Sequence, residues 1–394
     1  MKCILMNKNT EILVAEYDDT IKVFTEVIEI KNIDYAPFIL KKVYEKENSE
    51  DIRTTLTNWF RGRGIPTWRD KLDLLLYKLN INSPEELLNK SFGLSLSDQY
   101  WLKPYDSDIK YDDINFFDHD FDSADFLEAT FTNKSFTITN EEALKTPNNT
   151  TDGMLKKTWI IENGKRFLLK GGYKNEILQP FNEVLASEIC ERLGFSHVSY
   201  SIDIIKDRIV SKCECLTTKD TEIIPAYQII YGNKKNKNIL DYENYINILV
   251  ENGIKSAREK LENMYVLDFI IMNEDRHLNN FGIIRDVNTL EWLDICPIFD
   301  NGQSLNINFY DENIVIAEGE GRLFYEIKSF DEIIKIVKDI KRIDIAKLEG
   351  IVEWFDELLH KYQNITNITD RRINNLCILL NRQINKIKKM IDNQ

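Results

Sequence analysis

The sequence predicts an α+β protein in which sheet-forming segments come first and a helical region follows. Apolar and polar residues alternate over much of the stretch from residue 2 to 40, which is the period of half-buried strands. Between residues 135 and 216, strand-like segments flank a single helical segment, and helical spacing predominates from residue 217 onward. We therefore expect an N-terminal domain over 1–134, a sheet-containing segment over 135–216 and a helical segment over 217–394.

The composition places the chain among ordinary globular proteins. It has 394 residues, 43% hydrophobic and 29% charged, which excludes a wholly disordered chain and allows two or three domains. The net charge of −14 opposes contact with nucleic-acid phosphates and anionic lipids, so we expect neither direct nucleic-acid binding nor membrane binding. The N-terminus contains no apolar run long enough for a signal peptide, and we expect a cytoplasmic location.

The N-terminal domain is expected to consist of strands followed by helices. Helical spacing covers 48–60 and 67–79, and a third helix is expected to begin after Ser83, with Pro84 in its first turn and Glu86 completing a capping box. Eight aspartates lie between residues 105 and 125, in a stretch without glycine. This composition favours a solvated acidic connector over a calcium loop, and we expect the domain to end near residues 134 and 135.

Local turn signals define the elements that follow. Asn163-Gly164 predicts a hairpin turn, and Gly194 is expected to end a helix that begins near residue 180. Strands are expected at 198–205 and 208–216, and helices at 254–272, 330–338, 347–362 and 369–391.

A polar loop after the long apolar helix contains the first candidate functional residues. Asp275 lies in this loop, Asn280 follows five residues later, and Asp300 comes twenty residues beyond, after an apolar pair. Phosphoryl transfer needs a carboxylate that orients the attacking hydroxyl and accepts its proton, and it needs hard oxygen ligands for Mg²⁺. Asp275 suits the first role, and Asn280 and Asp300 suit the second.

A lysine and a glutamate upstream add a second part to this pattern. Lys170 ends an apolar strand, where a buried charge requires a partner, and Glu183 lies at the start of the next helix. An ion pair between a strand lysine and a helix glutamate positions the nucleotide phosphates in protein kinases.

Together these residues resemble the HipA-like kinases, a branch of the protein-kinase-like fold. The resemblance rests on Lys170, on Asn182-Glu183, on the loop Asn273-x-Asp275-x-His277-x-x-Asn280 and on Asp300, and it extends from about residue 135 to the C-terminus. It implies a two-lobed fold with an antiparallel-sheet N-lobe and a helical C-lobe. It further implies a kinase that uses ATP and Mg²⁺ to phosphorylate Ser or Thr hydroxyls of a protein substrate.

The resemblance also implies further nucleotide-site residues. The nucleotide-covering loop would be 147–157, which includes Gly153 and ends at Lys157, and the adenine would lie near Glu214 and Leu216. The corresponding loop in the family is self-phosphorylated, which makes Thr150 and Thr151 candidate acceptors. The family includes toxins held by a small antitoxin, so such a partner is a further expectation.

Two departures from the family pattern keep alternatives open. Asn279 occupies the position of a family lysine, and the nucleotide loop has one glycine, so a kinase-shaped module that binds nucleotide or a partner without turnover is one alternative. The string Asp275-Arg276-His277-x-x-Asn280 is also similar to the catalytic loop of phosphoinositide kinases, which leaves a lipid or small-molecule acceptor as another. Within this loop we expect His277 to brace the backbone and Arg276 to be solvated or to contact phosphate.

Overall fold

The computed structural model describes residues 1–46, 49–69, 72–132, 144–151, 153, 155–172, 177–233 and 239–393. The predicted domain boundary near residues 134 and 135 lies outside these residues. The chain forms two compact units, each assembled from separate stretches of sequence. The first unit contains 1–169, 214–234 and 284–293, and the second contains 170–213, 235–283 and 294–394.

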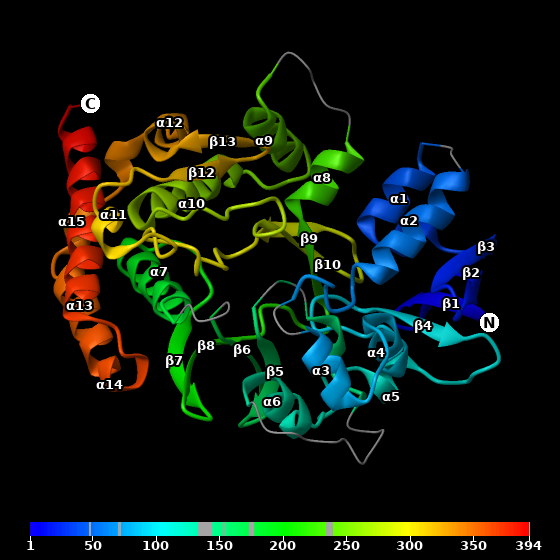
Figure 1. Cartoon of the computed structure of the whole chain (residues 1–394). Coiled ribbons are helices and arrows are strands. Elements are labelled where there is room, and N and C mark those ends of the chain that lie inside the picture. The colour runs from blue at the N-terminus through cyan, green and yellow to red at the C-terminus, as the bar shows by residue number, and fades with distance from the viewer. Residues whose placement is uncertain are drawn as a thin grey trace. The chain divides into compact units, whose positions relative to one another are not determined.

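A four-stranded antiparallel sheet organises the N-terminal part of the first unit, coloured blue in Figure 1. Its strands lie in the order β3 (Val23–Ile30), β2 (Thr10–Asp18), β1 (Lys2–Asn7) and β4 (Tyr100–Pro104). The first three strands pack one side against α1 (Phe38–Tyr44) and α2 (Ser49–Arg61). The half-buried pattern predicted for β1 is wrong, because Ile4 and Met6 on its other side belong to a second buried apolar cluster. The sequence does not predict that β4 pairs with β1.

The remaining elements of the first unit include several of those expected. They are α3 (Leu72–Leu79), α4 (Pro84–Lys90), α5 (Tyr111–Ile114), α6 (Ala124–Phe131), a 3-10 turn (Pro147–Thr150), β5 (Lys157–Glu162), β6 (Lys165–Lys170), β9 (Thr221–Pro225) and α8 (Ala226–Gly232). The Ser83 hydroxyl accepts a hydrogen bond from the backbone nitrogen of Glu86 at 3.3 Å, which confirms Ser83 as the cap, whereas the Glu86 carboxylate accepts from the backbone nitrogen of Asn82 at 3.1 Å and does not close the predicted box. β5 and β6 are neighbouring strands, and Asn163 and Gly164 between them both have positive φ, which confirms the hairpin.

The acidic stretch is anchored at intervals by aromatic side chains. Tyr111 and Phe116 are 1% and 5% exposed, whereas most of the aspartates around them are exposed. The stretch is therefore solvated as predicted, but its aromatic residues hold it against the first unit.

The second unit is mainly helical and contains two antiparallel strand pairs. One pair is β7 (Tyr200–Ile205) with β8 (Arg208–Glu214), and the other is β12 (Glu320–Leu323) with β13 (Glu326–Ser329). The helices are α7 (Gln179–Leu193), α9 (Asp241–Glu251), α10 (Ala257–Ile271), α11 (Asp311–Ile314), α12 (Phe330–Ile333), α13 (Ile351–Lys361), α14 (Gln363–Thr366) and α15 (Asp370–Asn393).

Helix α10 forms the centre of this unit. It packs against α7, α12 and α15, and α15 also packs along α13, both drawn in red and orange tones in Figure 1. Gly194 adopts a left-handed conformation with φ 72° and ends α7, as predicted. Because α10 packs against α7, the two helices belong to the same packed part of the second unit.

Five strands in the region expected to be helical, β9 to β13, correct the prediction. β10 (Gly282–Asp286) lies between β9 and β11 (Trp292–Ile295) in a three-stranded sheet. The described elements are thus mixed α and β with antiparallel strands, in agreement with the predicted class.

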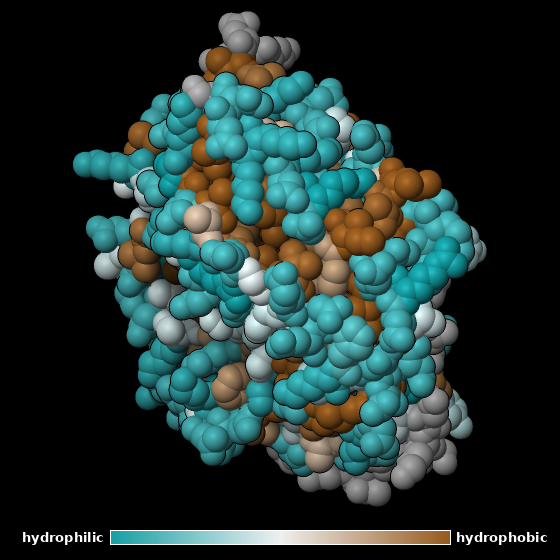
Figure 2. Space-filling view, turned by 90° about the vertical axis from the view of Figure 1, so that its left-hand side faces the viewer, coloured by the Kyte–Doolittle hydropathy of each residue, from teal (hydrophilic) through white to brown (hydrophobic). Residues whose placement is uncertain are grey.

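On the face drawn in Figure 2, hydrophilic side chains predominate, with apolar patches between them. Among the residues that the structure describes, no helix is both long and apolar enough to cross a membrane.

Candidate functional site

The loop after α10 is closed by its own side chains. α10 ends because Met272 takes a left-handed conformation with φ 51°. The Asn273 side chain donates to Asp268 Oδ1 at 3.0 Å and accepts from the backbone nitrogen of Asp275 at 3.1 Å. The Asn280 amide nitrogen donates to the Asp275 carbonyl oxygen at 2.8 Å. These contacts fix the backbone on both sides of the Asp275 carboxylate.

Arg276 joins this loop to the segment that contains Asp300. Its side chain is 1% exposed, and its guanidinium group donates to the Asp268 carboxylate at 2.8 Å. The same group donates to the carbonyl oxygens of Asn280 and Phe299 at 3.1 and 2.6 Å, and to Asn301 Oδ1 at 2.5 Å. The prediction that Arg276 is solvated or contacts phosphate is therefore wrong, because burial and Asp268 make it a structural cation.

Lys170 lies at the centre of a buried charge cluster. Its Nζ is 3.0 Å from Glu183 Oε1, 3.1 Å from the Tyr200 hydroxyl and 3.2 Å from Asp300 Oδ1. Lys170 and Glu183 are 4% and 2% exposed. The ion pair expected between Lys170 and Glu183 is present, whereas the spacing of the sequence gave no indication of Tyr200 or of the contact with Asp300.

Electrostatics keep the lysine charged despite its burial. Burial alone opposes the ammonium charge, but the carboxylates of Asp300 and Glu183 together raise the pKa of Lys170 well above its ordinary value. The site therefore holds a permanent cation next to two acids.

Two residues near the amino end of α7 hold the segment that follows Asp300. Glu183 Oε2 accepts from the backbone nitrogen of Asn301 at 2.8 Å. The Asn182 amide donates to the carbonyl oxygens of Gly302 and Ser304, both at 2.9 Å. The Asn182-Glu183 pair thus organises both the lysine and the backbone next to Asp300.

The Asp275 carboxylate faces the side chains of His277 and Arg322. His277 Nε2 lies 3.9 Å and Arg322 Nε 3.7 Å from its oxygens, and the Asp275 side chain is 39% exposed. Burial raises the pKa of Asp275 above its ordinary value, and the nearby His277 and Arg322 oppose that rise. His277 Nδ1 also accepts from the backbone nitrogen of Asn279 at 3.2 Å, a contact that braces the loop.

Asn280 and Asp300 have the chemistry expected of magnesium ligands. The amide nitrogen of Asn280 is used within the loop, so its oxygen is the atom suited to a cation, and Asp300 offers a carboxylate. Mg²⁺ is commonly bound by one or two protein oxygens together with substrate phosphates. In the described part of the chain, no cluster of three or more His, Cys, Asp or Glu side chains could hold a metal ion.

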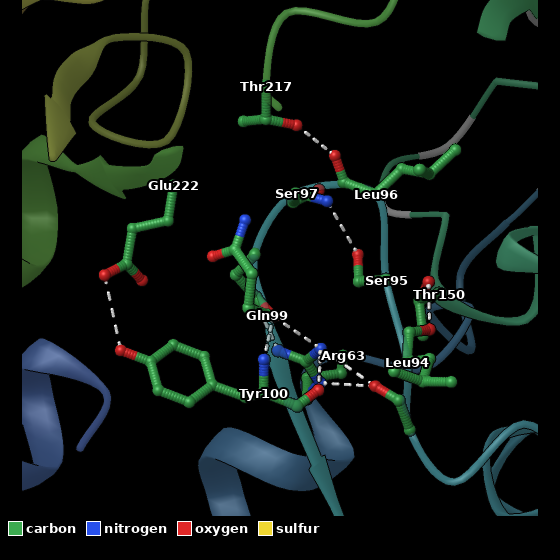
Figure 3. Close-up of polar contacts among 12 residues, drawn as sticks. Arg63, Leu94, Ser95, Leu96, Ser97, Gln99, Tyr100, Thr150, Thr217 and Glu222 are labelled. Atoms are coloured by element: carbon green, nitrogen blue, oxygen red, sulfur yellow. Dashed lines mark hydrogen bonds and ion pairs between the residues drawn. The ribbon is translucent and has the colours of Figure 1, made fainter. Parts of the chain in front are cut away.

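The candidate nucleotide loop lies in the first unit and is tightly hydrogen bonded there. The Thr150 hydroxyl donates to the Leu94 carbonyl oxygen at 3.1 Å; both residues are labelled in Figure 3. The Thr151 hydroxyl accepts from the Arg69 guanidinium at 2.8 Å, and Arg69 also donates to the Gly153 carbonyl oxygen at 3.1 Å. Both threonines are nearly buried, at 9% and 4% exposure, so a phosphate donor could reach them only after this loop opens.

Lys157 reaches the same loop. A Cβ atom on Gly153 would lie 2.8 Å from Lys157 Nζ, and the φ of Gly153 is +91°. Glycine is favoured at this position by its positive φ, and a larger residue would require the Lys157 side chain to move.

The segment proposed to contact adenine is fixed by neighbouring backbone. Glu214 pairs with Lys165 at 2.9 Å in an exposed ion pair, and the Thr217 hydroxyl donates to the Leu96 carbonyl oxygen (Figure 3). Leu216, between them in sequence, is half-buried. Buried polar contacts support the surrounding part of this unit, including Glu222 with the Tyr100 hydroxyl in the same view.

The predicted site residues are thus divided between the two units. Those in the first unit are Thr150, Thr151, Gly153, Lys157, Glu214 and Leu216, and those in the second are Lys170, Glu183, Asp275, Asn280 and Asp300. The structure brings the second group together through Arg276, Asn182 and Lys170. The roles of both groups toward a nucleotide stay predictions.

Comparison with known proteins identifies kinases among the similar chains. No protein-family model matches the sequence. The serine/threonine-protein kinase CtkA of Helicobacter pylori is 28% identical over 131 residues, which are 32% of this chain. The chain spans 40% of the length of that relative.

Solved structures are also similar to this chain. The crystal structure of the H. pylori proinflammatory kinase CtkA is 19% identical with a TM-score of 0.47, covering 60% of this chain and 92% of that chain. A chain from the Shewanella oneidensis MR-1 toxin–antitoxin complex of HipA, HipB and operator DNA has a TM-score of 0.53 and 10% identity, over 99% of both chains. The second likeness extends over nearly the whole sequence and concerns the fold.

Proposed function

Because the chain has the fold of the HipA-like kinases, we propose that it is an ATP- and Mg²⁺-dependent phosphotransferase that phosphorylates Ser or Thr hydroxyls of a protein. The observation that carries this proposal is the buried contact of Lys170 with both Glu183 and Asp300. A cation held between these two acids is the arrangement needed to place nucleotide phosphates beside a metal ligand.

Each residue of the second unit has a distinct role in this proposal. Lys170, braced by Glu183, binds the phosphates, and Asp275 orients the acceptor hydroxyl and accepts its proton. Asn280 and Asp300 would hold Mg²⁺, which supplies positive charge to the β- and γ-phosphates. Positioning and charge neutralisation carry most of the rate in such sites.

The first unit would contribute the nucleotide contacts. Gly153 and Lys157 would cover the phosphates, and the backbone near Glu214 and Leu216 would contact the adenine. We assign the two-lobed arrangement to 135–216 and 217–394, preceded by an accessory domain over 1–134. The same enzyme would modify itself at Thr150 or Thr151.

The partner proposals follow from the relatives. CtkA is named a serine/threonine-protein kinase, and the HipA structure contains HipB and operator DNA. We assign this chain a protein substrate, a small antitoxin-like partner and a cytoplasmic role as a toxin, with no membrane contact and no direct nucleic-acid contact.

A second candidate function is supported by Asn279. A neutral side chain replaces the family lysine in the catalytic loop, which favours a kinase-shaped module that binds nucleotide or a partner without turnover. A kinase with a lipid or small-molecule acceptor is the third candidate.

Intact-mass analysis after incubation with Mg²⁺ and ATP tests the proposal, with a bacterial protein mixture present as acceptor. The wild-type chain or an acceptor should gain phosphate, whereas Asp275→Asn should transfer at least a hundredfold less because the proton acceptor is lost. Glu274→Gln is the matched control, since it neutralises the adjacent carboxylate and should retain transfer.

Equal transfer by wild type and Asp275→Asn would remove Asp275 from the mechanism. Phosphate found only on lipid or small-molecule acceptors, when these are supplied in parallel, would support the third candidate. Nucleotide binding without transfer to any acceptor would support the second.

A further inference from the structure

We infer that the guanidinium group of Arg322 contacts the transferring phosphoryl group and supplies the positive charge that the catalytic loop lacks at Asn279. This inference rests on the proposed function and names an additional catalytic residue for it. Arg322 follows Asp300 by 22 positions and belongs to no motif singled out in the sequence.

Arg322 lies next to the carboxylate proposed as the proton acceptor. Its Nε is 3.7 Å from Asp275 Oδ1, and the two side chains are 45% and 39% exposed. The separation is that of a loose ion pair, and both groups remain open to an incoming substrate. A guanidinium group can donate two parallel hydrogen bonds to phosphate oxygens, which makes arginine suited to this position.

The backbone before Arg322 is packed closely against the start of the catalytic loop. Gly319 has φ +62°, and a Cβ atom there would lie 3.0 Å from Met272 Cε and 3.1 Å from Asn306 Oδ1. A Cβ atom on Gly321 would lie 2.8 Å from Phe330 and 2.9 Å from Ile333. Because a Cβ atom at these positions would crowd Met272, Phe330 and Ile333, the two glycines permit β12 to pack close to Met272, which immediately precedes the loop.

The backbone after Arg322 is anchored to the other end of the same loop. Phe324 packs against Phe281 at 5.7 Å between ring centroids, and Phe281 directly follows Asn280. Phe324 also contacts Tyr242 and Tyr245 at 6.1 and 5.6 Å. Arg322 is therefore fixed from both sides relative to Asp275.

The charge distribution leaves this position for Arg322. Arg276 is committed to the buried Asp268, and Lys170 is shared between Glu183 and Asp300. Asn279 contributes no charge. Among the described side chains within ion-pair distance of the Asp275 carboxylate, Arg322 is the permanent cation, and His277 is charged only when protonated.

In the chemical step the acceptor hydroxyl oxygen forms a bond to the γ-phosphorus of ATP. The bond from that phosphorus to the β–γ bridging oxygen breaks, and its electron pair leaves on ADP. The hydroxyl proton passes to the Asp275 carboxylate. Arg322 exchanges its loose pairing with Asp275 for the equatorial oxygens of the moving phosphoryl group, whose charge an arginine neutralises effectively.

Binding of a transition-state mimic tests this role without turnover. Calorimetry would compare Mg²⁺-ADP with Mg²⁺-ADP plus aluminium fluoride, which stands in for the moving phosphoryl group, for wild type and Arg322→Ala. The variant should bind Mg²⁺-ADP with the same affinity as wild type. The increase in affinity produced by aluminium fluoride should be at least tenfold smaller in the variant than in wild type. Arg371→Ala is the matched control, because Arg371 forms an exposed pair with Glu312. Adding Asn279→Lys to Arg322→Ala should restore part of the loss.

Two results would overturn the inference in distinguishable ways. If wild type gains affinity with fluoride and Arg322→Ala gains as much, Arg322 does not contact the phosphoryl group and the proposed function stands. If wild type binds neither ligand, the proposed function fails and this inference fails with it. Steady-state kinetics should agree with the first measurement: Arg322→Ala lowers kcat and leaves the KM for ATP unchanged.

Discussion

Arg276 is the side chain that connects the two halves of the candidate site. It neutralises the buried Asp268 and bonds to the backbone of both Asn280 and Phe299. Removing one partner of a buried ion pair leaves the other charge without compensation, which is costly. The loop geometry therefore depends on a cation that does not face the substrate.

Substitution of Arg276 should test this dependence. Arg276→Met removes the guanidinium group and should lower the free energy of unfolding by about 3–5 kcal/mol, because Asp268 remains buried without its cation. Urea denaturation followed by circular dichroism gives the value. Arg371→Met on the exposed surface should change it by about 0.5 kcal/mol or less, and equal effects of the two substitutions would contradict the structural role.

The acid limb of activity should report on Asp275. Since burial raises its pKa, the carboxylate takes up a proton at a higher pH than an ordinary aspartate and ceases to act as a base there. The rate should be full above this raised pKa and should fall tenfold per pH unit below it. A kcat/KM profile would show the limb, and Arg322→Ala should move it to higher pH because a charge that lowers the pKa is lost. An unchanged limb in this variant would argue against the Asp275 assignment.

The ion pair of Lys170 with Glu183 was predictable from residue type and position, and it is present. The roles of Asp275 and Asp300 in phosphoryl transfer stay predictions, although the structure places both residues in the same unit as this pair. Arg276 and Arg322 were not predictable in their positions, because burial and long-range pairing decide which arginine is solvated. The sequence around a charged residue in a polar loop does not indicate whether its side chain is buried or which distant residue it pairs with.

The hairpin β12–β13 packs closely against its neighbours at glycine residues, which have no side chain. Gly319 has a left-handed conformation and also lies against Met272, Asn306 and Phe330. Gly350 has a similar φ of +75°, but a Cβ atom there would meet nothing within 4 Å. A comparison of substitutions at these two glycines therefore distinguishes the cost of a left-handed backbone from the cost of crowding a packed neighbour.

Alanine at both glycines should reveal the difference. Gly350→Ala should cost about 1–2 kcal/mol from the left-handed conformation alone. Gly319→Ala should cost about 1–3 kcal/mol more, because the added carbon crowds Met272 and Phe330. Chemical denaturation of both variants measures the difference, and equal costs would show that the packing at Gly319 relaxes freely.

Elements with local signals were predictable, and those made by distant pairing were not. The Ser83 cap, the Asn163-Gly164 turn and the Gly194 helix end are set by two to four neighbouring residues. β10 is a short strand that pairs with β9, about 60 positions earlier in the sequence, and β11 pairs in turn with β10. Their sequences alone fit helix, strand or loop.

At the scale of the whole molecule, the chain divides differently from the three expected segments. Residues 214–234 and 284–293 belong to the same compact unit as the N-terminal 169 residues. A division into consecutive segments cannot describe a chain that leaves one compact unit and later returns to it. Such returns depend on contacts between residues far apart in the sequence. The division into an accessory domain over 1–134 and two lobes over 135–216 and 217–394 stays a prediction.

Nucleotide should stabilise the whole chain if the proposal holds. At a hundred times its Kd, Mg²⁺-ATP should add about 2.7 kcal/mol to the free energy of unfolding, seen as a higher Tm. Asp275→Asn should keep this gain, since Asp275 handles the proton and not the nucleotide. Lys170→Met should lose most of it, because the phosphate contact is removed. A wild-type Tm that ignores the nucleotide would contradict an ATP site of any kind.

Asn182 and Glu183, near the amino end of α7, couple this helix to the segment that follows Asp300. Three buried hydrogen bonds join Asn182 and Glu183 to the backbone at 301–304. Displacement of the helix would therefore move the backbone next to Asp300 with it, or would break bonds worth roughly 1 kcal/mol each. If Lys170 and Asp300 have the proposed roles, such a displacement would disturb the proposed phosphate and metal positions together.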